Sequence, residues 1–458
     1  MIVTARLLML GFLTVAALPA VAAVINVGPG GTTLPLALTA AGAAGDDEIR
    51  IADGEFVGNF AFAMAEAGQL TISGGWNPTF TMQTADPART VLDGAASGHT
   101  FYVSGNVGRV EIHNLTLRNG RAFTGAGMEA FVTGAAQLLL ADVVVRDNLA
   151  TWEFASNGGG LKLVAQGDAS VEVVDCVVRN NRAESTANST LGGGAYFVGG
   201  GHSQMLVVGS VFDNNVADAP NSPQGGGFRI DASELATFEL SRNVLRGNRL
   251  QGGAAAGGFG AAVSVSGADD AAVDLRAGRI VGNDDLSRES DRHQVHAVME
   301  NASTLKFGDS EVSAGNGGGA LAHAFDTASA KLVNLTVADN SAGGVVLDRT
   351  ASAITTIFSS ILWGNGGVEL ASNLAPNSVT RNRIEGSGGA TDPRFVDAAG
   401  GNYRLRGDSP AIDQGDATPD GGIGSIDADG VERRVGENVD QGAYEFGAYL
   451  VFADGFEG

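Results

Sequence analysis

The chain has little of several residue types that mark common protein classes. Its 458 residues include one cysteine, Cys176, so no disulfide can form within the chain. Because Cys176 lies in the apolar run Val171–Val178, we expect it to be a small buried side chain in the middle of a strand. After the N-terminal segment no apolar run approaches the roughly 18 residues of a membrane-spanning helix, and no transmembrane segment is predicted there.

Positive charge is also scarce. The chain has 28 Lys and Arg against 51 Asp and Glu, which gives a formal net charge of −23. Lys162, Lys306 and Lys331 are the only lysines. A chain this acidic is repelled by phosphate backbones and anionic surfaces, so nucleic acid is not an expected partner.

Residues 1–23 have the pattern of a secretory signal peptide. Arg6 supplies the positive start, residues 7–17 the apolar stretch, and residues 21–23 a small-residue cleavage site. We therefore expect an exported protein, located outside the cell or on the outer surface of a bacterium. The alternative is that this segment is a buried first strand.

Glycine, in contrast, is abundant and follows a repeat. There are 68 glycines, about twice the average frequency of roughly 7%, without a collagen-like triplet. A recurrent Asn closes each unit, beginning with Asn119, and in eight units it follows 21 residues after a fixed position that is usually Gly. These pairs are Gly127 and Asn148, Gly160 and Asn181, Gly194 and Asn215, Gly227 and Asn248, Ala262 and Asn283, Val295 and Asn316, Gly319 and Asn340, and Gly344 and Asn365.

Within each unit apolar residues occupy fixed offsets. The unit after Gly160 has Leu161, Leu163, Val171, Val173 and Val178 at these positions. Alternating pairs separated by turns indicate three short strands per unit. The unit must stack on its neighbours to bury its apolar side, which predicts a parallel β-helix with right-handed winding.

Two details of the stacking can also be predicted. We expect the recurrent Asn to adopt left-handed backbone angles and to bond through its amide to the Asn of the next coil. The unit after Val295 places Lys306 and Gly308 at apolar offsets, so a slipped register is expected there.

The predicted fold is therefore all-β, with about twelve coils over residues 24–390 and the most regular repeats at about 115–366. A short helix in residues 33–44, which begins with Thr33 and includes Pro35, is expected to cap the N-terminal coil. Residues 391–446 form an irregular C-terminal cap, followed by a tail at 447–458.

Some motifs resemble known families. The segments Gly192–Ala195, Gly317–Leu321 and Phe212–Asn215 resemble the repeats of polymorphic outer-membrane proteins. The segments at 392–397, 403–405, 409–415, 427–430 and 440–446 resemble the choice-of-anchor Q domain. These resemblances imply a bacterial secreted or surface β-helix of the pectin-lyase-like type, with varied C-terminal anchors. No obvious anchor is present in the tail.

The segments from each Asn to the next unit, here called arms, vary in length and should stack into a ridge or groove over residues 120–294. Variable loops on a rigid scaffold commonly carry binding sites. Phe123, Trp152 and Phe154 lie in the first two arms, where aromatic rings among amide and hydroxyl side chains suit sugar rings. The alternative is that these rings pack beneath the loops.

The sixth arm is the richest in ionisable residues. Asp291, Arg292 and His293 are the candidate catalytic residues, with Asp284, Asp285 and His296 nearby. Carboxylates and cations on a β-helix surface suit acid/base chemistry on polysaccharides. A solvated charged loop is the simpler interpretation, and two histidines without a third ligand rarely bind zinc.

The C-terminal cap holds a group of acidic residues that suggests calcium. Asp413, Asp416, Asp427 and Asp429 lie in turns, and oxygen-rich turns suit Ca²⁺. The alternative is that these residues form turns through their own side chains. Calcium is thus a possible cofactor rather than a required one.

Two functions follow from these patterns. The first is non-enzymatic binding of a polysaccharide or cell-surface glycan, or adhesion, through the arms at residues 120–294. The alternative is a carbohydrate-active enzyme, a polysaccharide lyase or glycoside hydrolase, with its site near residues 284–296.

Overall fold

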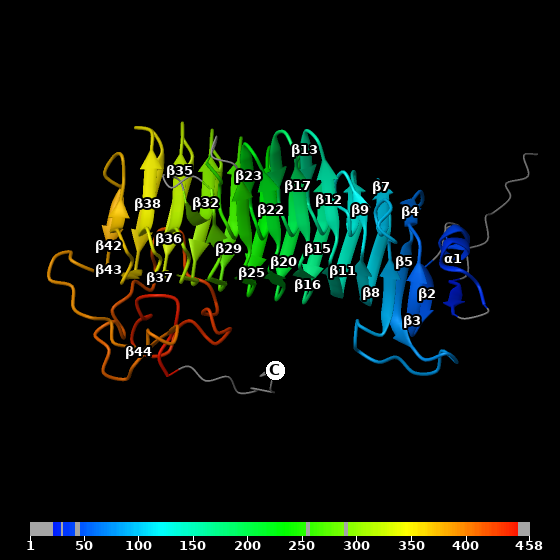
Figure 1. The fold of residues 1–458 in the computed structure, drawn as a ribbon. Helices are drawn as coiled ribbons and strands as arrows, with labels where there is room; N and C mark the ends of the chain where they lie inside the picture. The colour runs from blue at the N-terminus through cyan, green and yellow to red at the C-terminus, as the bar shows by residue number, and fades with distance from the viewer. Residues whose placement is uncertain (1–21, 29–30, 42–45, 253–256, 288–291, 448–458) are drawn as a thin grey trace, which may run out of the picture.

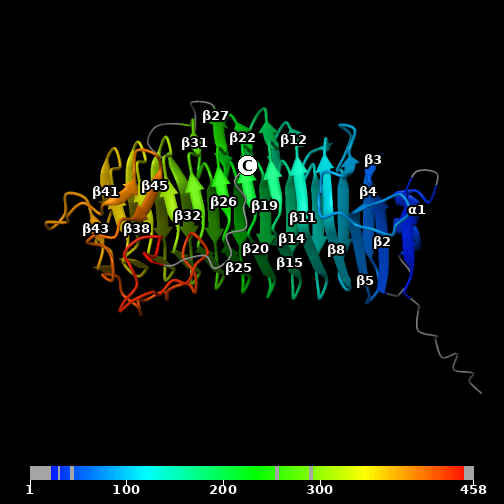
Figure 2. The same ribbon diagram turned by 90° about the horizontal axis from the view of Figure 1, so that it is seen from below.

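The computed structural model describes residues 22–28, 31–41, 46–252, 257–287 and 292–447. Successive coils stack side by side into a rod that runs from α1 to β43 (Figures 1 and 2). Within these residues every pairing between named strands is parallel except that of β44 (Phe395–Asp397) with β45 (Asn402–Leu405). The prediction of a right-handed parallel β-helix is confirmed.

One wall of the rod is a sheet with one strand from each of eleven described coils, here called the arm-side sheet. Its strands are β4 (Phe60–Met64), β7 (Phe101–Gly105), β10 (Met128–Val132), β14 (Leu161–Ala165), β19 (Ala195–Gly199), β24 (Phe228–Ala232), β28 (Val263–Gly267), β32 (His293–Met299), β35 (Gly318–Ala324), β38 (Gly343–Arg349) and β41 (Val368–Ala371).

The other two walls belong to one bent sheet, here called the large sheet. Its strands are β1 (Val24–Val27), β2 (Asp46–Ala52), β3 (Gly54–Val57), β5 (Gln69–Trp76), β6 (Thr90–Asp93), β8 (Arg109–Arg118), β11 (Gln137–Arg146), β15 (Ser170–Val174), β16 (Val177–Arg179), β20 (Gln204–Val208), β21 (Val211–Asp213), β25 (Thr237–Ser241), β26 (Val244–Arg246), β29 (Ala272–Arg276), β30 (Arg279–Val281), β33 (Thr304–Gly308), β34 (Glu311–Ser313), β36 (Ser329–Val333), β37 (Thr336–Ala338), β39 (Ile354–Phe358), β40 (Ile361–Trp363), β42 (Ser378–Thr380) and β43 (Arg383–Ile384).

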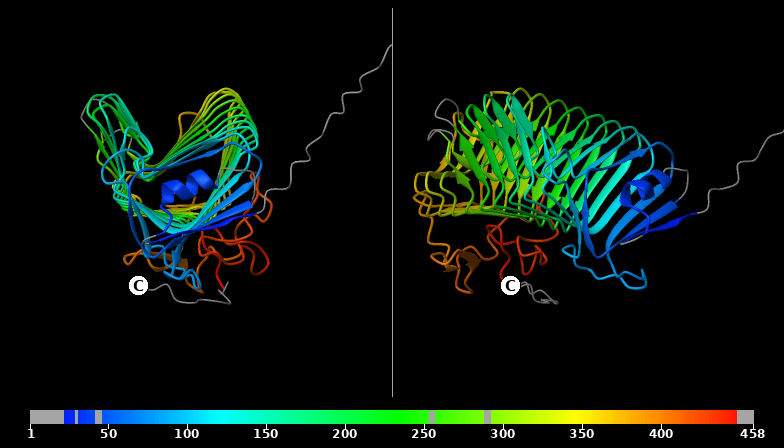
Figure 3. Two further views of the ribbon diagram at one scale, coloured as in Figure 1. Left: turned by 90° about the vertical axis from the view of Figure 1, so that its right-hand side faces the viewer. Right: turned by 45° about the vertical axis from the view of Figure 1, so that its right-hand side comes forward.

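The arms stack as predicted, and they form two further sheets. The outer arm sheet contains β9 (Arg121–Ala122), β12 (Leu149–Trp152), β17 (Arg182–Ser185), β22 (Val216–Ala219), β27 (Arg249–Gly252) and β31 (Asp284–Asp285), and the inner arm sheet contains β13 (Ala155–Asn157), β18 (Ser189–Leu191) and β23 (Ser222–Gln224). Seen along the rod axis, the arms make a ridge that projects from one corner of the cross-section (Figure 3).

The core follows the predicted offsets. Leu161, Leu163, Val171, Val173 and Val178 are all buried, and their equivalents in neighbouring coils stack above and below them. Apolar side chains at the same offset, such as Leu163 and Phe197, therefore form continuous columns along the rod. The N-terminal end is closed by α1 (Leu34–Ala40), which buries Leu34, Ala37 and Leu38 inside the first coil (Figure 3), as predicted.

A ladder of asparagine side chains runs along one corner, also as predicted. Asn148 Nδ2 donates to Asn181 Oδ1 at 2.9 Å, and the same bond repeats from Asn181 to Asn215, Asn248 and Asn283. The predicted left-handed backbone angle is found at Asn119, with φ 55°, but it is wrong for the asparagines of the ladder. There the left-handed residue is the preceding one, for example Asp147 with φ 57° and Asn180 with φ 56°. The asparagines of the ladder lie outside the left-handed region of backbone angles, and their side-chain amides stack on one another along the rod.

Cys176 is buried, but its predicted place in a strand is wrong. It lies in the bend between β15 and β16, after Asp175, which has φ 50°. The backbone N–H of Cys176 donates to Ser210 Oγ of the next coil at 3.1 Å. The sequence does not reveal this bend, because Val173 before it and Val178 after it are both buried apolar residues.

The predicted C-terminal cap lies along the rod rather than across its end. Residues 391–447 (orange to red in Figure 1) pack against the large sheet over its last coils. Tyr403 Oη donates to Asp339 Oδ2 at 2.8 Å, and Tyr444 Oη donates to the buried Glu311. Arg433, 1% exposed, pairs with Asp309 at 3.1 Å.

Nowhere in the described ranges does a helix reach the length and apolarity needed to cross a membrane.

Candidate functional site

Outward-facing side chains of the arm-side sheet line up in register. Glu129, Lys162, Tyr196, Arg229, Ser264 and His296 lie opposite one another on consecutive strands from β10 to β32. We call these six residues the floor row. Adjacent strands are about 4.8 Å apart, so the row places one polar side chain at each step along the rod. Ser264 and His296 are buried, whereas the other four are partly exposed.

The arms border this row on one side. Thr124, in the first arm, donates from Oγ1 to Glu129 Oε1 at 3.0 Å. Farther along, the rings of Phe259 and His296 are 4.8 Å apart between centroids. Thr124 forms a parallel bridge with Asn157 of β13, and Phe259 forms one with Gln224 of β23. Because β18 pairs with both β13 and β23, the inner arm sheet forms a wall beside the floor row. We call the space between them the arm groove.

The charges of the floor row are paired. Lys162 Nζ lies 2.8 Å from Glu129 Oε1. Arg229 donates from Nε to Asp231 Oδ1 at 2.7 Å and from Nη1 to Ser264 Oγ at 2.7 Å. Tyr196 Oη donates to the other oxygen of Asp231. Asp231 therefore orients both the phenol of Tyr196 and the guanidinium of Arg229.

Two groups have pKa values shifted away from neutral pH. Burial, and then the negative charge and hydrogen bond of Asp231, raise the pKa of Tyr196, so its phenol stays protonated. Burial, with the nearby His323, His293 and Arg229, lowers the pKa of His296 to about 3. The groove therefore holds a protonated phenol and a neutral imidazole at neutral pH.

Two of the three predicted catalytic residues, Arg292 and His293, lie at the far end of the groove. Asp291 falls outside the described residues. Arg292 donates from Nε to the carbonyl of Ser287 at 2.9 Å, which ties the arm to β32. His293 begins β32 and lies near enough to His296 to lower its pKa. A catalytic role for these three residues stays a prediction.

The three predicted ligand-binding aromatics form one exposed cluster. Phe123, Trp152 and Phe154 are 65%, 45% and 54% exposed. Ring centroids are 5.7 Å apart for Phe123 and Trp152, and 5.5 Å apart for Trp152 and Phe154. The alternative that these rings pack beneath the loops is therefore wrong, and sugar binding stays a prediction.

The four predicted calcium ligands do not converge. Asp427 accepts from the backbone N–H groups of Asp429, Val431 and Glu445, while Asp429 pairs with Arg404. Asp413 and Asp416 accept from the backbone of Asn438 and Thr418 in separate turns. Within the ranges that the structure covers, no three His, Cys, Asp or Glu side chains gather in a metal-binding group. Asp416 bonds within its own turn, while Asp413, Asp427 and Asp429 also join separate segments of the cap. A calcium-binding role for these four residues stays a prediction.

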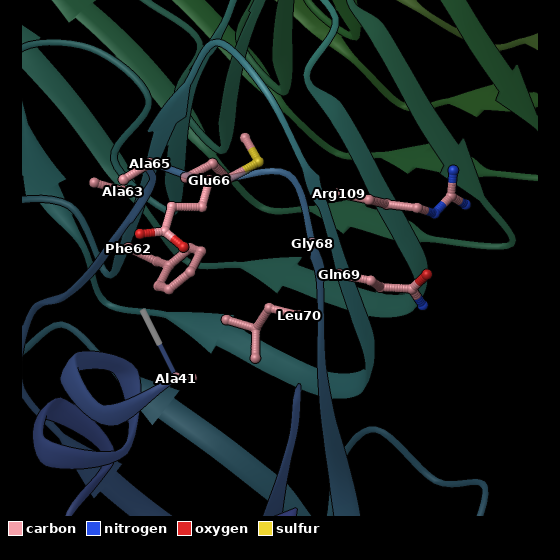
Figure 4. A pocket seen from close by; sticks show the side chains of 10 residues that line it. Ala41, Phe62, Ala63, Ala65, Glu66, Gly68, Gln69, Leu70 and Arg109 are labelled. Carbon is pink, nitrogen blue, oxygen red and sulfur yellow. The ribbon is translucent and has the colours of Figure 1, made fainter. Parts of the chain in front are cut away.

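Two hollows differ in what they can hold. A depression of about 620 Å³ opens at the N-terminal end of the arm groove, lined by His99, Arg121, Phe123 and Glu129 among others. A second cavity, near α1, is lined by Phe62, Glu66 and Leu70 (Figure 4). Its volume of about 30 Å³ is roughly the space of one water molecule, so this cavity is too small for a sugar, whereas the depression is large enough for one.

Sequence reasoning missed the floor row. The signal was present: in each unit a residue stands between two buried apolar positions, as Lys162 does between Leu161 and Leu163. One such residue in a single unit does not indicate a site, whereas in register the six form a row, of which Glu129, Lys162, Tyr196 and Arg229 are partly exposed.

Comparison with solved structures identifies the fold. The crystal structure of pectate lyase Pel9A matches with a TM-score of 0.50 and 13% identity, over 93% of this chain and 97% of that chain. A mannuronic acid specific polysaccharide family 6 lyase from human gut microbiota matches with a TM-score of 0.33 and 9% identity, over 76% of this chain and 82% of that chain.

No protein-family model and no curated protein matches the chain. The resemblances to the choice-of-anchor Q domain and to polymorphic outer-membrane repeats therefore gain no support from these comparisons. At 13% identity the match establishes the fold alone: this chain is a right-handed parallel β-helix of the pectin-lyase-like type, similar along nearly its whole length to pectate lyase Pel9A.

Proposed function

We propose that this protein is a polysaccharide lyase that holds an acidic glycan chain along the arm groove. The observation that carries the proposal is the floor row, in which Lys162, Tyr196 and Arg229 stand on three adjacent strands in register. The activity named for Pel9A, which has the same fold, supports an enzyme more than non-enzymatic binding.

A lyase breaks the C4–O bond of a uronate by elimination, and the row contains groups of the required kinds. Arg229 uses three of its five N–H donors on Asp231 and Ser264, so two are left to bind the substrate carboxylate and make the adjacent C5 proton more acidic. Tyr196, kept protonated, donates its proton to the leaving oxygen.

Lys162 is the proposed base. Its side-chain nitrogen lies 2.8 Å from Glu129 Oε1, and the residue acts as the free amine, formed by loss of a proton to water. The amine removes the C5 proton, the C5 electron pair forms the C4–C5 double bond, and the C4–O bond breaks. The products are an unsaturated sugar end and a new reducing end, with no net oxidation.

The test is an assay of the protein on pectate, alginate, glucuronan and their neutral counterparts, with and without calcium. Unsaturated ends are followed by their ultraviolet absorbance, and reducing ends are measured in parallel. Lys162→Met and Tyr196→Phe should each lower the rate at least about 100-fold, while His202→Ala, an exposed control, should not. An absence of product from every polymer would overturn the proposal.

The second candidate is glycan binding without cleavage, through the arms. The exposed cluster of Phe123, Trp152 and Phe154 favours it, because large apolar side chains exposed together commonly mark a binding surface. If the panel yields no product, retention of the folded protein on immobilised polysaccharides would support this candidate. Loss of that retention in Trp152→Ala would locate the binding surface.

Export forms part of the proposal. The pattern of residues 1–23 supports a cleaved signal peptide, and a polymer-degrading enzyme meets its substrate outside the cell. Mass spectrometry of the protein from a producing culture should find it in the medium or on the cell surface, beginning at Val24. An intact N-terminus inside the cell would contradict export.

A further inference from the structure

The depression at the N-terminal end of the arm groove has the features of a separate sugar site. It lies where the arm wall begins, at β9, and is bounded by His99, Arg121, Phe123, Thr124 and Glu129. Its volume of about 620 Å³ is within the usual range of small-molecule sites, about 300–1,000 Å³.

The depression contains one positive charge that the protein does not neutralise. Glu129 is already held by Lys162 at 2.8 Å, by His99 Nε2 at 3.2 Å and by Thr124. The exposed side chain of Arg121 has no ion pair and no hydrogen bond with any residue that the structure describes. In a chain of net charge −23, an unpaired guanidinium in a hollow is well placed to bind an anion.

An aromatic surface continues from the same depression. Phe123 lines it, and Trp152 and Phe154 extend the surface along the arms. The C–H face of a sugar ring gains free energy by covering such apolar area, while its polar edges stay in water. A ring resting on Phe123 can point an anionic substituent toward Arg121.

We propose that this depression is a subsite for one acidic sugar residue, with Arg121 binding its anionic group and Phe123 and Trp152 packing on its ring. The inference rests on the proposed function, because it places this residue on the same glycan chain. Glu129 is two strands from Tyr196 in the floor row, about 10 Å along the rod. The subsite therefore lies about two coils from Tyr196 along the same glycan chain.

Binding can be measured without cleavage in the Tyr196→Phe background. The probes are tetramers of galacturonate, mannuronate and glucuronate, their methyl esters, and a sulfated neutral tetramer, which separates carboxylate from sulfate recognition. Tryptophan fluorescence reports on Trp152, and a Trp152→Phe control should lose the signal although Trp76 and Trp363 are still present.

We expect at least one acidic tetramer to bind about tenfold or more tightly than its neutral counterpart, as a charge-assisted hydrogen bond requires. Arg121→Ala should abolish that preference, Arg121→Lys should restore part of it, and Phe123→Ala should weaken acidic and neutral forms alike. Arg179→Ala, which removes an exposed arginine of β16, is the matched control. Circular dichroism verifies that each variant is folded.

The outcomes separate this inference from the proposed function. Arg121-dependent binding by a protein that cleaves nothing would support the subsite and overturn the lyase. Normal cleavage with unchanged binding in Arg121→Ala and Phe123→Ala would support the lyase and overturn the subsite. Binding of none of the acidic tetramers would overturn the subsite in either case.

Discussion

Gln294 Nε2 donates to Asn340 Oδ1 at 2.7 Å, across 46 residues of sequence. Gln294 Oε1 accepts from Asn283 Nδ2 at 2.9 Å, so this one amide joins the two halves of the asparagine ladder. The cause is the slipped register expected after Val295. Val295 pairs with Val263, which places Gly315, instead of Asn316, opposite Asn340. The gap in the ladder is filled from the side by Gln294.

Replacing Gln294 should therefore destabilise the rod. Gln294→Ala leaves the backbone N–H and one side-chain N–H of Asn283 without their acceptor in a fully buried place, while the other side-chain N–H keeps the carbonyl of Leu245. Buried unpaired groups cost about 1–3 kcal/mol each, so we expect a loss of about 3 kcal/mol in the free energy of unfolding. Urea unfolding measures this, with the exposed Gln204→Ala as control. A loss equal to that of the control would contradict the ladder repair.

A regular ladder should be recoverable in a double variant. A Cβ at Gly315 would lie 2.6 Å from the side chain of Gln294, so Gly315→Asn alone should be destabilising. Combined with Gln294→Ala, it recreates the arrangement of Ala262 and Asn283. The double variant should be more stable than either single variant, with a coupling energy of about 1–3 kcal/mol in a double-mutant cycle. Simple additivity would show that the two positions do not share one space.

Stability should fall as pH rises toward neutrality because of Glu445. Burial first, and then Asp440, raise the pKa of Glu445 to about 7, against the opposing effect of Arg433. A carboxyl with a raised folded pKa stabilises the fold below its unfolded pKa, and this contribution is lost as pH rises through the folded value. Between about pH 4.5 and 7 it should cost the protein about 3 kcal/mol at most.

Thermal unfolding from pH 4 to 8 tests this effect. Glu445→Gln cannot ionise and should lose this part of the slope, whereas the exposed Glu437→Gln should keep it. The pKa values of Asp427 and Asp440 are raised by burial as well, so a residual slope in Glu445→Gln is expected. Identical pH profiles for Glu445→Gln and the native chain would contradict the assignment.

Cys176 should be unreactive in the folded protein. Burial raises the pKa of its thiol to about 12, and its side chain is 1% exposed. A thiol reagent at pH 8 should therefore label the protein only in denaturant, in a one-to-one ratio. Rapid labelling of the native protein would mean that the bend at Cys176 opens easily.

The sequence alone determined the local and periodic features of this protein. A fixed spacing of apolar residues predicts three strands per coil, since strand and turn geometry depend on neighbouring residues. The 21-residue interval located the ladder, and Thr33 with Pro35 located the capping helix. The poor fit of Lys306 and Gly308 even indicated where the register slips.

Only the tertiary structure decided which side chains from distant coils meet. Lys162 and Tyr196 are 34 residues apart and become neighbours because the arms between them fold outward and return in register. The partners of Glu311 and Asp309 come from Tyr444 and Arg433, after the chain has doubled back along the large sheet. Such contacts depend on how whole elements are placed in space, and residue spacing in one unit carries no record of that placement.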